Sequence, residues 1–307
     1  MEPLASVAGR LRTIRDLIRF GASAFNEAGL VFGHGSDNAL DEALALVLFS
    51  LHLGHDSVSD YFDARLTEAE MGRIHALFAR RIEDRLPAAY LTHEAWFAGL
   101  SFYVDERVVI PRSPIAELIE QRFRPWYKPV GAARILDLCC GSGCIGIACA
   151  CAFPEAEVTL ADSDPAALEV ARRNVADYAF EARVKVVESD LFAGLAGERY
   201  DLIVCNPPYV DAATYASLPP EYRHEPRGGL ESGEEGLDHP LAVLRGAAEH
   251  LARDGVLVLE VGAAQSALER TMPNLEAVWV EFARGGEGVA VITRAALSAP
   301  NALERAA

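Results

Sequence analysis

Apolar and polar positions repeat with a helical spacing over the first part of the chain. In residues 8–86, apolar side chains recur every three or four positions in three segments, which is typical of amphipathic helices. Asp37 is expected to cap the second helix, in which residues 44–49 form a buried apolar run, and Thr67 begins a Thr-x-x-Glu pattern typical of a capping box. Pro87 ends this region, so we predict a helical N-terminal domain.

After residue 95 the spacing changes, and short apolar runs alternate with helical segments. Residues 96–110 predict a β-hairpin that closes on 111–114, followed by a helical connector at 114–124 and a proline-containing joint near 125–131. Further strands are expected at 134–138, 157–161, 183–187, 200–205 and 255–261, helices at 144–153, 165–179 and 239–252, and a terminal hairpin at 277–283 and 288–293. The alternation predicts an α/β fold with a doubly wound, mostly parallel sheet, to which the terminal hairpin adds one antiparallel strand.

These patterns divide the chain into three regions. We predict a helical domain at 1–92, a β-hairpin and linker at 93–128, and an α/β domain at 129–307. The N-terminal stretch is amphipathic and lacks the apolar core of a leader peptide. No apolar run has the length of a membrane-spanning helix, so a cytoplasmic location is expected.

The composition bears on partners. With 28 Lys and Arg against 45 Asp and Glu, the formal net charge is −17, and basic residues form no long tract. Nucleic acid binding depends on neutralising phosphates with Lys and Arg, so this balance disfavours a DNA enzyme and stable nucleic acid binding. It favours a small molecule or a basic protein as partner.

The cysteines predict neither disulfides nor a metal site. They are Cys139, Cys140, Cys144, Cys149, Cys151 and Cys205. Five of them crowd into thirteen residues of one apolar segment, where small buried thiols of a reducing compartment are expected. Zinc sites use paired spacings or nearby histidines, which this segment lacks, so no metal is expected.

The most informative stretch is the exit of the strand at 200–205. Its apolar run stops at Asn206, because the two prolines that follow cannot donate to a sheet ladder. The Asn206 side chain and the Pro207 carbonyl offer two acceptors, and the ring of Tyr209 follows. Such a device can hold a planar NH2 group, although Asn-Pro also marks ordinary turns at which a surface tyrosine follows a strand.

A second set of strand ends points to a cofactor. The turn after the first strand of the α/β domain contains Gly141 and Gly143, which let the backbone approach a ligand closely. Asp162 ends the next strand about twenty residues later, where a carboxylate can accept both hydroxyl protons of a ribose. Asp190 follows the third strand and can contact an adenine amino group while Leu191 or Phe192 packs on the base. With Asn206, these strand ends predict one ligand site at the carboxyl edge of the sheet.

Taken in order, the glycine turn, the strand-end carboxylates and Asn-Pro-Pro-Tyr resemble the class I S-adenosylmethionine-dependent methyltransferases that modify an exocyclic nitrogen. Over nearly the whole chain the resemblance extends to the protein-glutamine methyltransferases. The segments that carry it are 33–38, 102–107, 110–114, 137–144, 206–211 and 221–226. Pro-Arg-Ser-Pro at 111–114 favours the branch that methylates the third protein of the large ribosomal subunit, because release-factor enzymes usually differ there.

The resemblance implies a seven-stranded sheet, S-adenosylmethionine as the methyl donor and an N-terminal domain that recognises a basic ribosomal protein. It implies catalytic roles for Asn206, Pro207, Pro208 and Tyr209. The implied cofactor-binding residues are Asp137, Cys139, Cys140, Gly141, Ser142, Gly143, Asp162, Asp190, Leu191 and Asn206. Cys139 replaces a glycine of the general family pattern. This replacement weakens the argument that glycines in this turn let the backbone approach the cofactor. A release factor, an adenine or guanine amino group, and a cofactor-binding module without catalysis remain the alternatives.

Other polar residues near these motifs have a functional and a structural interpretation. His34 and His224 invite a general-base role, although the bend between two glycines favours a structural one for His34. Arg112 either holds a carboxylate near the site or pairs with the acidic surface. Glu225 is expected to support a loop or the sheet edge rather than to transfer a proton.

Overall fold

The computed structural model describes residues 11–54, 60–128 and 132–304. The N-terminal stretch at 1–10, predicted to be amphipathic, lies outside the described residues. So does 129–131, the last part of the predicted joint. Within the described residues, no helix is both long enough and apolar enough to cross a membrane.

The chain forms two compact units, and one of them is not continuous in sequence. Unit 1 consists of Met1–Glu94 together with Pro219–His224, and unit 2 consists of Ala95–Leu218 and Glu225–Ala307. The short segment 219–224 therefore joins the helical unit although it follows the strand exit at 206–209 in sequence. The division of the chain at residues 92 and 128 stays a prediction.

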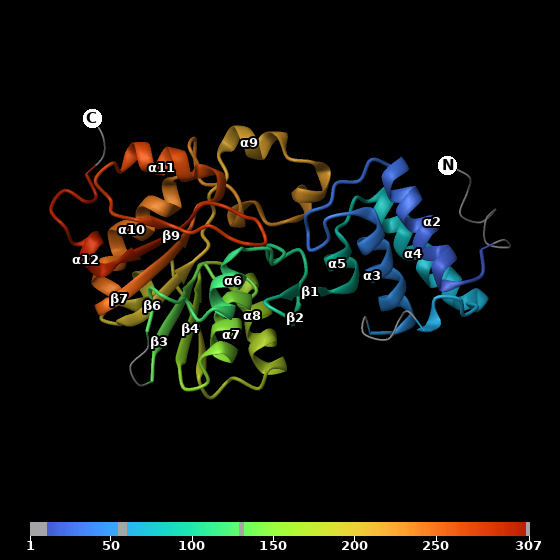
Figure 1. The fold of residues 1–307 in the computed structure, drawn as a ribbon, viewed down its shortest axis with the longest axis horizontal. Helices are drawn as coiled ribbons and strands as arrows, with labels where there is room; N and C mark the ends of the chain where they lie inside the picture. The colour runs from blue at the N-terminus through green and yellow to red at the C-terminus, as the bar shows by residue number, and fades with distance from the viewer. Residues whose placement is uncertain (1–10, 55–59, 129–131, 305–307) are drawn as a thin grey trace. The chain divides into compact units, whose positions relative to one another are not determined.

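Unit 1 is helical, as the apolar spacing predicts. Its α-helices are α2 (Ile14–Glu27), α3 (Ala39–Leu51), α4 (Glu68–Glu83) and α5 (Ala88–Thr92) (Figure 1). The predicted capping box is present, because the Thr67 side chain accepts from the backbone of Glu70 while the Glu70 carboxylate accepts from the backbone of Thr67. The core brings together Leu17, Phe25, Leu46, Ile74 and Phe78, all fully buried.

Two details of α3 differ from the prediction. Its cap is Asn38 and not Asp37, because the Asn38 Oδ1 accepts from the backbone of both Leu40 and Asp41 at 3.0 Å. The run at 44–49 is buried only in part, since Phe49 is 40% exposed. Six consecutive residues cover every side of a helix, so one of them must face away from the core.

Unit 2 contains the predicted α/β sheet (Figure 1). Its strands are β3 (Arg134–Leu138), β4 (Glu157–Asp162), β5 (Val184–Glu188), β6 (Tyr200–Cys205), β7 (Leu251–Glu260), β8 (Val278–Trp279) and β9 (Val289–Thr293). They lie in the order β5-β4-β3-β6-β7-β9-β8. The first five are parallel neighbours, and β9 pairs antiparallel with β7 and with β8. This confirms the mostly parallel seven-stranded sheet with one antiparallel strand.

Helices cover both faces of this sheet. The remaining α-helices of the unit are α6 (Ile115–Glu120), α7 (Cys144–Ala152), α8 (Pro165–Asp177), α9 (Ala212–Ser217), α10 (Asp238–His250), α11 (Gln265–Thr271) and α12 (Arg294–Leu297). Side chains of β6 alternate between two apolar clusters: Leu202 and Val204 share one with α6, α7 and α8, while Ile203 and Cys205 share the other with α10, α11 and α12. This alternation is the period of two expected of a strand buried on both faces.

The hairpin before the sheet is shorter than predicted. It consists of β1 (Glu94–Phe97) and β2 (Leu100–Tyr103), and regular pairing ends there. The next residues turn around Asp105, whose carboxylate accepts from the Arg107 backbone at 3.1 Å and from the Tyr103 hydroxyl at 2.9 Å. The Arg107 guanidinium, which also donates to this carboxylate, lowers the pKa of Asp105 to about 2, and the backbone and Tyr103 bonds add to this effect. A local side-chain bond of this kind competes with the strand ladder.

Packing between α7 and the sheet leaves no room for a side chain at Gly146. A methyl group there would lie 2.1 Å from Cδ2 of Leu160 and 2.9 Å from Cβ of Asp137. We expect Gly146→Ala to lower the free energy of unfolding by about 1–3 kcal/mol through overpacking. Gly72→Ala is the matched control, because Gly72 lies in α4 with no atom near the added methyl, and it should stabilise by about 0.5–1 kcal/mol. Urea unfolding followed by circular dichroism measures both, and equal shifts would contradict this packing.

Candidate functional site

The predicted site residues share one edge of the sheet in unit 2. Because β5, β4, β3 and β6 are parallel and adjacent, their carboxyl ends point to the same edge. Asp137, Asp162, Asp190 and Asn206 stand at or just after these ends. The predicted common edge is therefore confirmed, and it is the edge at which open α/β sheets bind ligands.

The turn after β3 is tied directly to the end of β4. The Gly141 backbone donates to the Asp162 carboxylate at 2.9 Å, and the Asp164 backbone donates to its other oxygen at 3.0 Å. Burial raises the pKa of Asp162, although these hydrogen bonds oppose the rise. A carboxylate has further lone pairs beyond those two bonds, so Asp162 keeps the capacity to accept from a ligand.

The backbone of this turn is left-handed at three positions. Cys139, Gly141 and Gly143 have φ of 60°, 51° and 78°. The cysteine that replaces the family glycine thus takes a conformation that glycine adopts more easily. At Gly141 a side chain would extend into open space, whereas at Gly143 it would meet Leu160 at 2.8 Å. Gly141 is therefore the point at which the backbone is open to a ligand.

Asp137 is buried beneath this turn. Its Oδ2 accepts from the backbone of Gly146 at 2.8 Å, and burial raises its pKa to about 8. Its Oδ1 is also buried and has no hydrogen-bond partner among the described residues. An unpaired buried acceptor is costly, so this oxygen is suited to a donor that arrives with a ligand.

The third strand end is more open. Asp190 is exposed, Leu191 is half-buried with φ of 46°, and the neighbouring Ser189 backbone donates to the Asp162 carbonyl at 2.8 Å. The bond from Ser189 brings the loop after β5 to the end of β4. The adenine contacts expected of Asp190 and Leu191 stay predictions.

The strand β6 ends directly before Asn206, where the sequence predicts its end. β6 ends at Cys205, Pro207 and Pro208 are buried, and Asn206 is half-buried. Within the part of the chain that the structure describes, no hydrogen bond engages the Asn206 side chain. Its amide group is thus presented at the sheet edge and can bind an external donor.

The ring of Tyr209 is bound at its hydroxyl and lies close to the backbone of Gly262. The hydroxyl donates to Oε1 of Glu260 at 2.9 Å, and a methyl group at Gly262 would lie 2.6 Å from Cε2 of the ring. Burial and the carboxyl of Glu260 raise the pKa of Tyr209 far above its ordinary range. The phenol is therefore neutral, and the ring has little freedom to move.

Sequence reasoning missed Glu260, which ends the apolar strand β7. It is 4% exposed and accepts from the Ser113 hydroxyl as well as from Tyr209. The available signal was a single carboxylate within the apolar run 255–261, since an unpaired charge is rarely buried in a strand. Ser113 belongs to the Pro-Arg-Ser-Pro segment, so that segment and Tyr209 share one partner.

The alternatives for Arg112 are resolved by its partner. Its guanidinium donates to both carboxylate oxygens of Glu225, at 2.5 and 2.8 Å, and the Ile110 backbone donates to Glu225 at 2.8 Å. Glu225 is 3% exposed. Arg112 thus holds a buried carboxylate, and Glu225 supports a loop as predicted. A bidentate arginine–carboxylate pair of this kind fixes the orientation of both side chains in addition to neutralising the buried charge.

Two further motifs meet in unit 1. Glu221 accepts from the Val31 backbone at 3.1 Å and from Arg85 at 3.0 Å, and it lies 3.6 Å from Arg81. The ring of His34 lies 4.2 Å from that of Tyr222.

The two histidines singled out by the sequence have structural contacts in unit 1. His224 donates to the Asp84 carbonyl at 2.9 Å, and His34 is buried against Tyr222. The structural interpretation of His34 is therefore the one that its surroundings favour.

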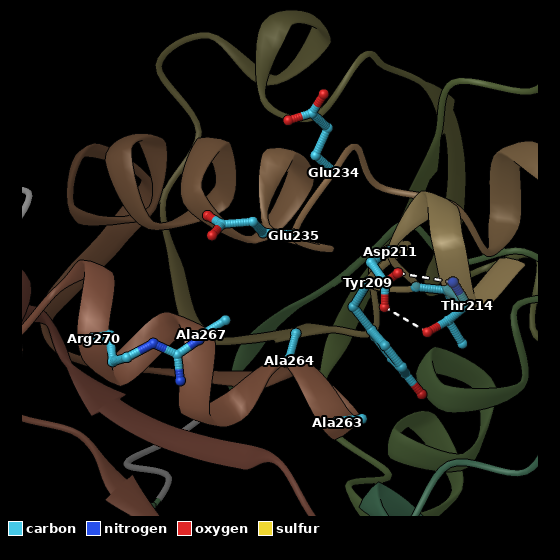
Figure 2. Close-up of a pocket in the computed structure, with 10 residues that line it drawn as sticks. Tyr209, Asp211, Thr214, Glu234, Glu235, Ala263, Ala264, Ala267 and Arg270 are labelled. Carbon is cyan, nitrogen blue, oxygen red and sulfur yellow. Dashed lines mark hydrogen bonds between the residues drawn. The ribbon is translucent and has the colours of Figure 1, made fainter.

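An acidic pocket of about 310 Å³ lies beside Tyr209 (Figure 2). Its lining residues are Tyr209, Val210, Asp211, Thr214, Glu234, Glu235, Ala263, Ala264, Ala267 and Arg270. Asp211 is engaged within the chain, because it accepts from the backbone and the hydroxyl of Thr214. Three carboxylates and one guanidinium give this pocket an acidic character next to the strand exit. The pocket could not be predicted from the segment around Tyr209, since Glu234, Glu235 and Arg270 come from segments farther along the chain.

Comparison with known proteins places the site in a family context. A model of the methyltransferase small domain matches residues 126–218. A ribosomal protein uL3 glutamine methyltransferase of Xanthomonas campestris pv. campestris is 53% identical over 285 residues, covering 93% of this chain and 92% of the relative. Proteins of the same name from Bordetella pertussis and Neisseria gonorrhoeae are 47% and 48% identical, covering 94% of this chain and 97% and 96% of the relatives.

The raised pKa of Asp137 makes a prediction for stability. Between the ordinary value of 3.8 and about 8, the folded chain binds more protons than the unfolded chain, so stability falls as the pH rises through this window. Asp137→Asn removes this titration and keeps an acceptor for Gly146. We expect its unfolding free energy to vary less with pH and to exceed that of the wild type by a few kcal/mol above pH 8 (about 1.4 kcal/mol for each pKa unit).

Urea unfolding of the cofactor-free chain at a series of pH values measures this difference. Asp254→Asn, at an exposed aspartate of the same unit, is the matched control and should follow the wild-type curve. Parallel curves for wild type and Asp137→Asn would contradict the prediction.

Proposed function

The chain belongs to the family of ribosomal protein uL3 glutamine methyltransferases, and we propose that it transfers a methyl group from S-adenosylmethionine to the side-chain amide nitrogen of a glutamine in uL3. The observation that carries this proposal is 47–53% identity over more than nine-tenths of both chains. The Asn206 exit at the edge of the parallel sheet supports it. We place the reaction in the cytoplasm, where a ribosomal protein is available.

The residues at the sheet edge fit this cofactor. Asp162 would accept from the ribose hydroxyls, and the buried Oδ1 of Asp137 would accept from the amino group of the methionine part. The open backbone at Gly141 allows close approach, and Asp190 with Leu191 would hold the adenine. The remaining turn residues that we assign to the cofactor are Cys139, Cys140, Ser142 and Gly143. What the cofactor supplies when bound is a methyl group on a positively charged sulfur.

Asn206 and Pro207 would hold the glutamine. The amide nitrogen is a poor nucleophile, because its lone pair is delocalised into the carbonyl group. The Asn206 Oδ1 and the Pro207 carbonyl each accept one amide hydrogen, so the nitrogen is oriented and its developing positive charge is stabilised. Pro208 stiffens the backbone, and Tyr209 packs beside the amide plane.

The proton balance needs no dedicated base. A bond forms between the amide nitrogen and the methyl carbon while the bond from that carbon to sulfur breaks. The methylated nitrogen then carries a proton that it loses readily to water or to an acceptor nearby. Glu225 is engaged by Arg112, and His34 is buried against Tyr222, so neither is assigned a proton-transfer role.

If Asn206 acts as an acceptor for the substrate amide, its removal should lower the rate of methyl transfer and leave cofactor binding nearly unchanged. Asn206→Ala is expected to lose methyl transfer, because one of the two acceptors is removed, with a fall in kcat of at least about 10²-fold. Its affinity for the cofactor should stay within severalfold of the wild type. The exposed Asn274 supplies the matched control, Asn274→Ala, which should behave as the wild type. Wild-type turnover by Asn206→Ala would exclude this role.

Substrate identity is tested with tritiated S-adenosylmethionine. Purified uL3, a peptide-chain release factor and nucleic acid are offered in parallel, and the modified residue is located by mass spectrometry. Label on a glutamine of uL3 alone is the expected result. Label on the release factor or on a base would replace the proposed substrate.

The acidic charge predicts how the substrate protein associates. With a formal net charge of −17, the chain should attract a basic ribosomal protein, and salt should weaken that attraction through screening. We expect the dissociation constant for free uL3 to rise severalfold between low and physiological ionic strength, as measured by calorimetry. Association that does not depend on salt would remove the electrostatic part of the proposal.

A further inference from the structure

Glu260 joins two motifs that are far apart in the chain. One oxygen of its carboxyl accepts from the Tyr209 hydroxyl at 2.9 Å, and the other accepts from the Ser113 hydroxyl. Ser113 also accepts from the Ile115 backbone at 3.1 Å, which fixes the start of α6. A single buried side chain thus connects the strand exit at 206–209 with the segment at 111–114.

The surroundings of the Glu260 carboxyl indicate that it acts as a hydrogen-bond acceptor. Glu260 is 4% exposed, and its two known partners are both donors. Burial raises the pKa of Glu260, while Ser113, Tyr209 and the charge of Arg112 oppose that rise. Arg112 itself is occupied by Glu225. These contacts are those of an acceptor that holds other groups in place.

The second constraint on Tyr209 comes from Gly262, two residues beyond Glu260. Because a methyl group at Gly262 would lie 2.6 Å from the ring, the backbone after β7 closes one side of the ring. The Val261 backbone donates to the Gly288 carbonyl at 2.7 Å, which ties this backbone to the start of β9. The end of β7 therefore contacts the ring on one side and binds its hydroxyl.

We propose that Glu260 is a positioning residue for methyl transfer, which holds the Tyr209 ring beside the Asn206 and Pro207 acceptors by binding its hydroxyl. The proposal rests on the proposed function and deepens it. An aromatic ring that packs on the amide plane must keep one orientation, since a displacement of about 1 Å can cost 10²-fold in rate. A carboxyl group suits the task because it accepts from Tyr209 and Ser113 at once.

A double-mutant cycle tests whether Glu260 acts through Tyr209. Glu260→Ala and Tyr209→Phe are each expected to lower kcat for uL3 by about 10- to 100-fold, with the cofactor dissociation constant unchanged. The double variant should be no slower than the slower single variant, because both changes remove the same contact. Glu260→Gln should recover most of the rate, since its amide oxygen can still accept from the phenol. Independent, multiplicative losses would overturn the proposal.

Two controls separate this role from a merely structural one. Melting temperatures identify any variant that fails to fold, and in that case Glu260→Met replaces Glu260→Ala in the cycle, because methionine fills a similar volume and lacks the carboxylate acceptors. The exposed Glu276 of unit 2 gives the matched change Glu276→Gln, which should leave kcat unchanged. A uniform loss of stability and cofactor affinity with kcat intact would assign Glu260 to folding alone.

A measurement without substrate separates this proposal from the proposed function. Carbon-13-labelled tyrosine shows the Tyr209 ring by NMR, with Tyr209→Phe to assign its signal. Faster ring motion in Glu260→Ala than in the wild type and Glu276→Gln is expected. Unchanged motion would overturn the positioning role even where wild-type methylation of uL3 is observed, whereas absent methylation with changed motion would overturn only the proposed substrate.

Discussion

The parallel pairing of β3 with β6 is the constraint on which the candidate site depends. Leu138 pairs with Cys205 at the end of both strands, so the turn that begins at Cys139 stands next to Asn206. The chain continues from β3 toward β4 on one side and from β6 toward β7 on the other. This is the place where strand order reverses, and it leaves the edge between the two strands uncovered by a crossover. A methyl donor and its acceptor can therefore meet there.

Buried carboxylates hold the segments around this edge and in the helical unit. Glu225 and Glu260 each bind two or more donors in unit 2. In unit 1, Glu42 pairs with Arg81 and Glu221 with Arg85. Burying a carboxylate costs roughly several kcal/mol of desolvation free energy. Only well-placed hydrogen-bond and ion-pair partners offset that cost. Such buried ion pairs add little to the free energy of unfolding. They do favour one conformation of the loop that carries them.

Local chemistry explains what the sequence could predict. The strands and helices of unit 2 follow from runs of apolar residues, and the Thr67 cap follows from a four-residue pattern. The preference for Asp37 over Asn38 failed because both residues make good caps, and only backbone geometry distinguishes them. The role of Glu260 was not predicted, because its partners Ser113 and Tyr209 are 147 and 51 residues away in sequence. Contacts over such separations depend on the fold and leave no local pattern.

The membership of residues 219–224 in the helical unit has a consequence for how this protein can be divided and inherited. A fragment that ends at Glu94 would contain Arg81 and Arg85 but lack Glu221, so two guanidinium groups would lose a buried counter-charge. A fragment that begins at Ala95 would carry that glutamate without its cations. Neither half is a free module, and an exchange of the helical unit between relatives requires two segments of the gene to change together.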